Sequence, residues 1–209
     1  YYLSCSPSVI AENLDAILLD GMEPPQTFTP KATAPTLLLQ DSKRVLQPAR
    51  FGLIPPGVKS PPKPLLNNAR VETLAEKWPW KLVLQQRCVL PMSTFVEYSY
   101  WGDPAGHQIS FAPRDQSLLL AAGLFNFWKS RGDAKQLTMT LLMRPAGEYV
   151  LEHGHHRQPL FVKRDGIDDW ISDQTLPWAK LKALLHRIVA EPELTHKLGP
   201  AMKPGWQKR

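Results

Sequence analysis

The spacing of apolar residues predicts helices mainly at the two ends of the chain and strands between them. Residues 8–20 carry apolar side chains at helical spacing, with Ser8 in the N-cap position and Gly21 beyond the end. Further helical patterns occur at 71–78, 168–173 and 178–190. Alternating or continuous apolar runs, typical of strands, occupy 36–40, 43–55, 87–101, 107–112, 117–128 and 136–144. This order of elements predicts the α+β fold class.

Prolines mark the irregular segments between these elements. The chain has 21 prolines, and they concentrate in 22–35 and 55–64. Because proline fixes φ and lacks an N–H donor, we expect both stretches to form ordered irregular loops.

Composition narrows the class of protein. A chain of 209 residues fits one large domain or two small ones and can bury about 70% of its unfolded surface. Without an apolar run that spans a bilayer or a secretory leader, we expect a cytoplasmic protein with no membrane partner. Cys5 and Cys88 are too few for a disulfide framework or a four-thiolate metal site. The net charge of +6 favours a polyanionic partner without specifying one.

Glu97 is the first candidate for chemistry, because it lies in an aromatic, strand-like run with Phe95, Val96 and Tyr98. A carboxyl group flanked by apolar residues is poorly hydrated, which raises its pKa and suits it to proton transfer near neutral pH. On the pattern alone, an outward-facing glutamate on an alternating strand is the preferred interpretation.

Three of the six histidines lie within four positions, at His153, His155 and His156, beside Arg157. On a strand, the first two would share a face and His156 would oppose them. Two imidazoles can bind zinc, but neither cysteine nor a nearby carboxylate supplies a further ligand. A solvated turn and a single catalytic histidine both stay open.

Arg50 and Phe51 form the third candidate, since a cation beside an exposed aromatic ring is suited to single-stranded nucleic acid. A buried Phe51 is equally compatible with the sequence. Trp78 and Trp80 are further candidates for base stacking, with the same alternative.

Five motifs in order resemble the SRAP family, the SOS-response-associated peptidases that capture abasic sites in DNA. They are FGLIP at 51–55, NARVET at 68–73, RCVLPMSTFVEY at 87–98, AGLF at 122–125 and HHRQP at 155–159. The resemblance extends to about Val162 and implies a single domain over 1–209, with a strand-rich, barrel-like mixed β core and flanking helices.

The resemblance implies a role for each matched residue. Asn68, Glu97 and His155 match the family's catalytic residues, which makes His153 and His156 incidental. Arg70 matches its phosphate-binding arginine. The remaining expected DNA contacts are Arg157, Arg50 and Phe51. No metal and no other cofactor is implied.

The family's nucleophile is a cysteine directly after the initiator methionine, and the resemblance puts it one position before Tyr1. Cys5, at an expected strand position, and Cys88 are interpreted as structural. The alternative is that this member has no nucleophile and binds single-stranded DNA without chemistry.

The implied function is covalent capture of abasic sites in single-stranded DNA. An α-amine has a pKa near 7.7–8.0 against about 10.4 for lysine, so it is the better nucleophile toward the sugar aldehyde at neutral pH. The cysteine thiol then closes a thiazolidine ring, assisted by proximity. The peptidase activity is interpreted as removal of the protein's own methionine. A histidine-cluster hydrolase or metal-dependent enzyme and a protein-interaction domain are the remaining alternatives.

Overall fold

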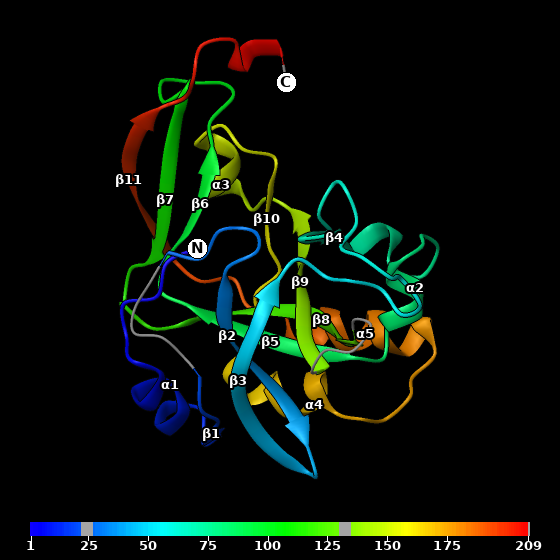
Figure 1. The fold of residues 1–209 in the computed structure, drawn as a ribbon. Helices are drawn as coiled ribbons and strands as arrows, with labels where there is room; N and C mark the ends of the chain where they lie inside the picture. The colour runs from blue at the N-terminus through cyan, green and yellow to red at the C-terminus, as the bar shows by residue number, and fades with distance from the viewer. Residues whose placement is uncertain (22–26, 130–134, 209) are drawn as a thin grey trace.

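A closed barrel of five strands forms the centre of the computed structural model, which describes residues 1–21, 27–129 and 135–208. Around the barrel, each strand pairs with the next, and a parallel pairing of the last strand with the first closes it. In this order the strands are β3 (Lys43–Phe51), β2 (Thr33–Gln40), β5 (Arg87–Met92), β8 (Leu119–Lys129) and β9 (Lys135–Pro145). Figure 1 shows these strands crossing in the lower half of the molecule.

The barrel forms because its strands bury apolar side chains on the inside and under the covering helices. Every residue of β5 is buried, which explains why its sequence runs apolar instead of alternating. Antiparallel β2 and β3 are joined at Asp41 and Ser42, which both have positive φ, as a two-residue hairpin turn with the natural strand twist requires.

Three short strands extend the barrel sheet. β1 (Ile17–Leu18) pairs with β3, whereas β4 (Asn68–Arg70) and β10 (Arg157–Pro159) both pair with β9. Within β9, Met143 is the register partner of both Arg70 and Pro159. The NARVET and HHRQP motifs, distant in sequence, therefore flank the same end of β9.

A second, antiparallel sheet stands above the barrel and consists of β6 (Phe95–Tyr98), β7 (His107–Pro113) and β11 (Leu194–Ala201). Figure 1 shows the chain's N-terminus where this sheet meets the barrel. Phe95 stacks on Phe111 at 5.0 Å between ring centroids and lies 5.5 Å from Phe161, which joins the sheet to the barrel side of the core.

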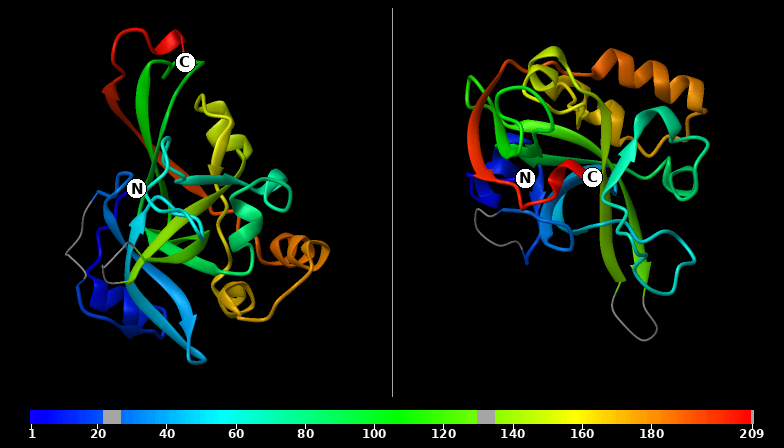
Figure 2. Two further views of the ribbon diagram at one scale, coloured as in Figure 1. Left: turned by 45° about the vertical axis from the view of Figure 1, so that its right-hand side comes forward. Right: turned by 90° about the horizontal axis from the view of Figure 1, so that it is seen from above.

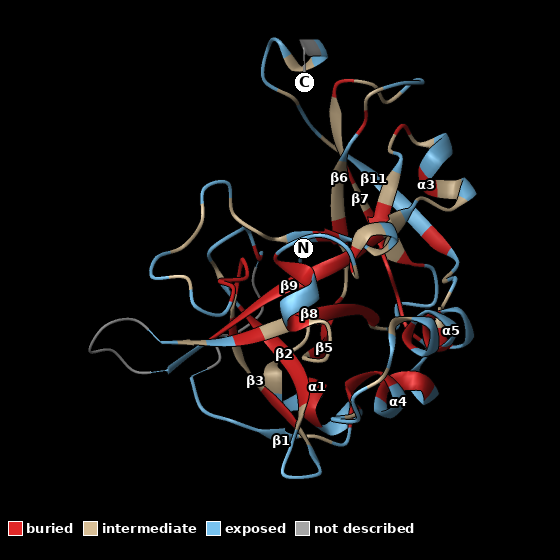
Figure 3. Ribbon diagram, turned by 90° about the vertical axis from the view of Figure 1, so that its right-hand side faces the viewer, coloured by how far each residue is buried: buried red, intermediate tan, exposed pale blue. Residues whose placement is uncertain are grey.

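Helices cover the outside of the barrel, with α1 (Pro7–Asn13) and α5 (Trp178–Ile188) on opposite sides (Figure 2). α4 (Ile167–Ile171) packs on β5, where the Trp170 indole donates to the Cys88 carbonyl at 2.9 Å. The buried Arg87 guanidinium donates to carbonyls at the end of α4, including Trp170 at 2.6 Å. Figure 3 shows the resulting pattern, with buried strands inside and exposed outer helix faces.

The remaining elements are short. They are α2 (Trp80–Val83), α3 (Glu148–Glu152) and the 3-10 turns η1 (Val71–Thr73), η2 (Arg164–Gly166) and η3 (Trp206–Lys208). Among the helices in the described ranges, none combines the length and the apolar character needed to cross a lipid bilayer.

The α+β class and the barrel-like core are confirmed, but several predicted boundaries are wrong. The first helix is capped by Ser6 instead of Ser8 and ends at Asn13, because Ile17 leaves it to pair with the edge of β3. The helix predicted at 71–78 is reduced to η1, and the strand predicted at 36–40 begins at Thr33. Of the loop predicted at 22–35, residues 22–26 lie outside the described part of the chain.

Candidate active site at the first residue

Glu97 lies on β6 with its side chain only 17% exposed, so the outward-facing interpretation does not describe it. Its carboxylate oxygen Oε2 is 3.4 Å from Nε2 of His155. Burial removes the hydration of the charged form and raises the pKa of Glu97 to about 8, although the nearby positive α-amine of Tyr1 opposes the shift. Glu97 therefore carries a proton through most of the neutral range.

His155 completes a proton-sharing pair with Glu97. Its Nδ1 lies 2.7 Å from the Tyr98 carbonyl oxygen, which can only accept, so Nδ1 carries the proton and Nε2 faces Glu97 as an acceptor. Burial lowers the pKa of His155; the bond to Tyr98 opposes this and neighbouring His156 reinforces it. A protonated carboxyl group beside a neutral imidazole is the arrangement that general acid–base catalysis uses.

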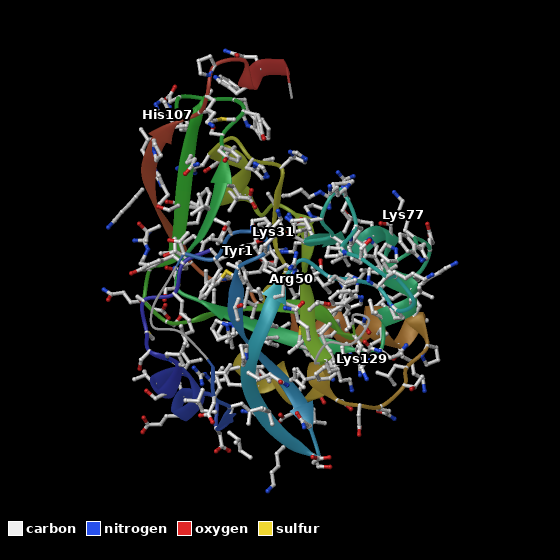
Figure 4. The ribbon with its side chains drawn as sticks, in the orientation of Figure 1. Tyr1, Lys31, Arg50, Lys77, His107 and Lys129 are labelled. Carbon is white, nitrogen blue, oxygen red and sulfur yellow. The ribbon has the colours of Figure 1, made fainter. Side chains whose placement is uncertain are left out.

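Tyr1 lies next to this pair because a backbone bridge fixes the start of the chain. The Tyr2 N–H donates to the Thr94 carbonyl at 2.9 Å, directly before β6, and the Tyr1 α-amine donates to the Phe28 carbonyl at 3.2 Å. Burial lowers the pKa of that α-amine, whereas the Glu97 charge raises it. Figure 4 shows Tyr1 near the middle of the molecule, where the upper sheet meets the barrel.

The Tyr1 side chain links the pair to the NARVET motif. Its hydroxyl donates to Oδ1 of Asn68 at 3.5 Å, and its ring meets Phe51 edge-on at 5.3 Å between centroids. Burial, followed by the Glu97 charge, raises the pKa of the Tyr1 phenol. The structure thus gathers Asn68, Glu97 and His155 around the first residue.

The expected stacking role of Phe51 does not fit the structure. Phe51 is only 2% exposed and packs inside the barrel, so its ring has no face available to a base. Trp80 is also buried in the core, whereas Trp78 is 56% exposed. Periodicity could not distinguish Trp78 from Trp80, because the first lies in a turn and the second begins the short helix α2, where burial depends on tertiary packing.

The three candidate arginines differ in their surroundings. Arg70 is exposed on β4 and is available to a phosphate. Arg157 instead donates from Nη1 to Oε1 of Glu72 at 2.6 Å, so its charge is already compensated. The Nε of Arg50, on β3, is buried and has no hydrogen-bond partner among the described residues.

The three clustered histidines have different surroundings and lie on no strand, so the alternation described for a strand does not apply to them. His153 ends α3, and its Nδ1 lies 2.7 Å from the Tyr149 carbonyl. His156 is exposed and stacks on His155 at 5.2 Å between centroids. Within residues 1–21, 27–129 and 135–208, no three His, Cys, Asp or Glu side chains gather as metal ligands.

The two cysteines differ in their burial. Cys88 is buried on β5, and burial raises the pKa of its thiol. Cys5 is half-buried in a bend before α1, not on a strand as expected. Both are free thiols.

Some groups that shape the site cannot be identified from the sequence pattern. The Tyr98 carbonyl fixes the tautomer of His155, and a backbone oxygen has no signature in a pattern of side chains. The pairing of Glu72 with Arg157 depends on two strands meeting at β9. Tyr1 was indicated only indirectly, because the resemblance places the family's nucleophile one position before it.

The closed barrel beneath a second sheet defines a mixed α+β protein, and a family model identifies its class more closely. The model of the family described as SOS response associated peptidase (SRAP) matches residues 1–198. The chain therefore belongs to the SRAP family, which makes it a DNA-damage-associated, peptidase-like protein.

Solved structures share the fold. A protein from Bordetella bronchiseptica superposes with a TM-score of 0.77 at 17% identity, over 96% of this chain and 98% of that one. A phage-related protein from the same organism gives 0.71 at 22% identity, over 94% and 92%. A Bacteroides thetaiotaomicron protein gives 0.75 at 16% identity, over 99% and 93%. No curated protein sequence matches the chain.

Proposed function

We propose that the protein captures abasic sites in single-stranded DNA covalently, through a cysteine directly before Tyr1. The observation that carries the proposal is the buried Glu97–His155 pair beside the Tyr1 nitrogen. A residue joined to that nitrogen would be the new N-terminus and would have the pair within one residue's reach. Its amine would also share the partly desolvated surroundings that lower the pKa of an amine.

The proposed reaction needs proton transfers that this pair supplies. The neutral amine attacks the sugar aldehyde, and the resulting carbinolamine loses water when its hydroxyl receives a proton. Glu97, protonated up to a pH of about 8, is the donor. The cysteine sulfur then adds to the imine carbon while the nitrogen takes a proton, which closes the thiazolidine ring. One water molecule is released in all, and His155 Nε2 accepts and returns the protons that pass between these steps.

Arginine side chains provide the contacts with the DNA backbone. Arg70 is exposed beside Asn68 and suits a phosphate next to the abasic sugar. Arg50 and Arg157 are secondary contacts, since the first is partly buried and the second is paired with Glu72. We assign the family's peptidase activity to removal of the methionine that precedes the cysteine.

The test uses the chain with methionine and cysteine directly before Tyr1. Intact-mass analysis should show loss of the methionine, and incubation with an abasic oligonucleotide should give a band shift that survives heat and detergent. The matched cysteine→serine variant should bind the oligonucleotide without a stable shift. If the serine variant gave the same stable band, capture through the thiol would be wrong.

His155→Ala tests the proton relay separately. We expect slower crosslinking at pH 7 with largely unchanged binding, because His155 moves protons and makes no phosphate contact. An unchanged rate across the pH range would refute its role.

Non-covalent binding of single-stranded DNA is the second candidate. The exposed Arg70 and the net charge of +6 favour it, since neither depends on a nucleophile. It predicts salt-dependent binding of abasic and undamaged oligonucleotides alike, with no stable band.

A further inference from the structure

Five aromatic rings form a continuous row with His155 at its centre. His155 stacks on His156, and on its other side lies 5.7 Å from Tyr100 between centroids. Trp101 extends the row beyond His156, at 6.4 Å. Trp206 extends it beyond Tyr100, at 6.5 Å.

These rings line a cavity of about 530 Å³ that opens beside His155. Its lining consists of Tyr100, Trp101, His155, His156, Trp206 and Gln207. The volume lies within the range of about 300–1,000 Å³ that small-molecule sites have. None of the roles assigned to the Glu97–His155 pair uses Trp101, Trp206 or Gln207.

Trp206 comes from a segment of the chain beyond the family match, which ends at residue 198. This segment turns over the loop between β6 and β7 (Figure 1), where the Met202 N–H donates to the Gly106 carbonyl at 2.7 Å. Gly106 has φ +83, and a Cβ there would lie 3.1 Å from the indole of Trp206. The indole is therefore held in position by a close contact that glycine permits, which lowers the cost of ordering it on binding.

We propose that this cavity is a stacking site for the unpaired base of the nucleotide directly next to the abasic site, with Trp206 as its principal ring. The inference rests on the proposed function, because it takes the abasic sugar to lie at Glu97 and His155. The cavity adjoins His155, so the nucleotide directly next to the abasic site would lie against it. Its rings suit any base, since every base has a π-face.

Charge around the cavity agrees with a nucleotide better than with an apolar ligand. Lys203 precedes Trp206 on the same segment, and the two line a neighbouring hollow with Tyr98 and Gln108. A lysine at the edge of an aromatic cavity is suited to the phosphate of the stacked nucleotide. The side chain of Gln207 adds a donor and an acceptor for a base edge.

The test measures reversible binding by fluorescence anisotropy, with single-stranded oligonucleotides that carry a central tetrahydrofuran. This stable abasic analogue cannot open to an aldehyde, so the crosslink does not enter the measurement. Two further oligonucleotides lack the base of the 5′ or the 3′ neighbour as well. The proteins are the unmodified chain, Trp206→Ala, Trp206→Phe, and Phe127→Ala as an exposed-aromatic control on β8, outside the cavity.

We expect Trp206→Ala to raise the Kd for the first oligonucleotide by about 5- to 150-fold, the range for losing one base–aromatic stack. Trp206→Phe should retain most of the affinity, and Phe127→Ala should bind like the unmodified chain. For one of the two oligonucleotides without a neighbouring base, the unmodified chain should bind weakly and Trp206→Ala should change nothing further.

An equal effect of Trp206→Ala on all three oligonucleotides, or none, would overturn the stacking site. Tighter binding by Trp206→Ala would also overturn it and would show that the C-terminal segment covers the site. The proposed function has a separate readout. If binding and its dependence on the base persist but no crosslink forms, covalent capture is wrong and the stacking site stands. If no oligonucleotide binds, both are wrong.

Discussion

Two glutamates, each paired with a basic side chain of the HHRQP motif, show how surroundings decide what a carboxyl group does. Glu97 is 17% exposed and faces a neutral imidazole, and its pKa rises to about 8. Glu72 is 43% exposed and faces the guanidinium of Arg157, which stays charged. The first pair can exchange a proton near neutral pH, whereas the second holds η1 against β10 and compensates an arginine. The same residue type thus serves chemistry in one place and electrostatics in the other.

The largest effect is expected from a variant that removes the carboxyl proton from the Glu97–His155 pair. Glu97→Gln keeps the shape of the side chain but cannot donate a carboxyl proton, so the single-turnover crosslinking rate should fall by about 10²- to 10⁴-fold. Glu72→Gln is the matched control and should crosslink at nearly the normal rate. Similar losses in both variants would show that the two carboxyl groups are not distinguished in the way proposed.

A comparison of Arg70→Ala with Arg157→Ala tests whether the ion pair with Glu72 reduces the contribution of Arg157 to DNA binding. Arg70→Ala should weaken single-stranded DNA binding about tenfold and lower the salt slope by about 0.7, the value for one phosphate contact. Arg157→Ala should do less, because Glu72 already compensates its charge. Titrations at several salt concentrations measure both values, and a larger effect of Arg157 would reverse the assignment.

Stability should show the cost of burying Glu97. The folded protein retains a proton that the unfolded chain, with the ordinary pKa of 4.5, releases, so the Glu97 contribution to stability falls as pH rises from about 4.5 to about 8. Glu97→Gln removes this dependence. The melting temperature of Glu97→Gln minus that of the unmodified protein should therefore increase by at least about 2 °C from pH 5 to pH 8. This corresponds to about 1 kcal/mol for a chain of this length. A constant difference across that range would contradict the raised pKa.

The smallest effect comes from releasing Arg157. Glu72→Gln frees its guanidinium for phosphate, which should tighten DNA binding about two- to fivefold at low salt, with little change at high salt. Arg157→Ala combined with Glu72→Gln should lose this gain. A gain that survives in the double variant would have another origin.

Much of the fold followed from local patterns, and the errors have identifiable causes. Long apolar runs predict β5, β8 and β9, and alternation predicts the half-buried β7. β11 was missed because its residues are largely exposed and β-like alternation is weak there. The helix at the start was drawn too long because Ile17 and Leu18 continue the helical spacing while their backbones pair with β3.

The features of the site likewise divide into those that the motifs indicated and those that only the fold revealed. Motif resemblance selected Asn68, Glu97 and His155, and the structure brings all three to Tyr1. It could not reveal that Phe51 is buried or that Arg157 is compensated, because both depend on which strands meet around β9. Trp206 lies outside the matched motifs, and no local pattern connects it with Tyr100.

The sequence by itself determined the order of helices and strands and the types of side chain available for chemistry, since both depend on neighbours along the chain. Only the tertiary structure decided which of those side chains lose contact with water and which face one another. Proton affinity depends on hydration and on nearby charge, and closure of the barrel under the upper sheet sets both at Glu97.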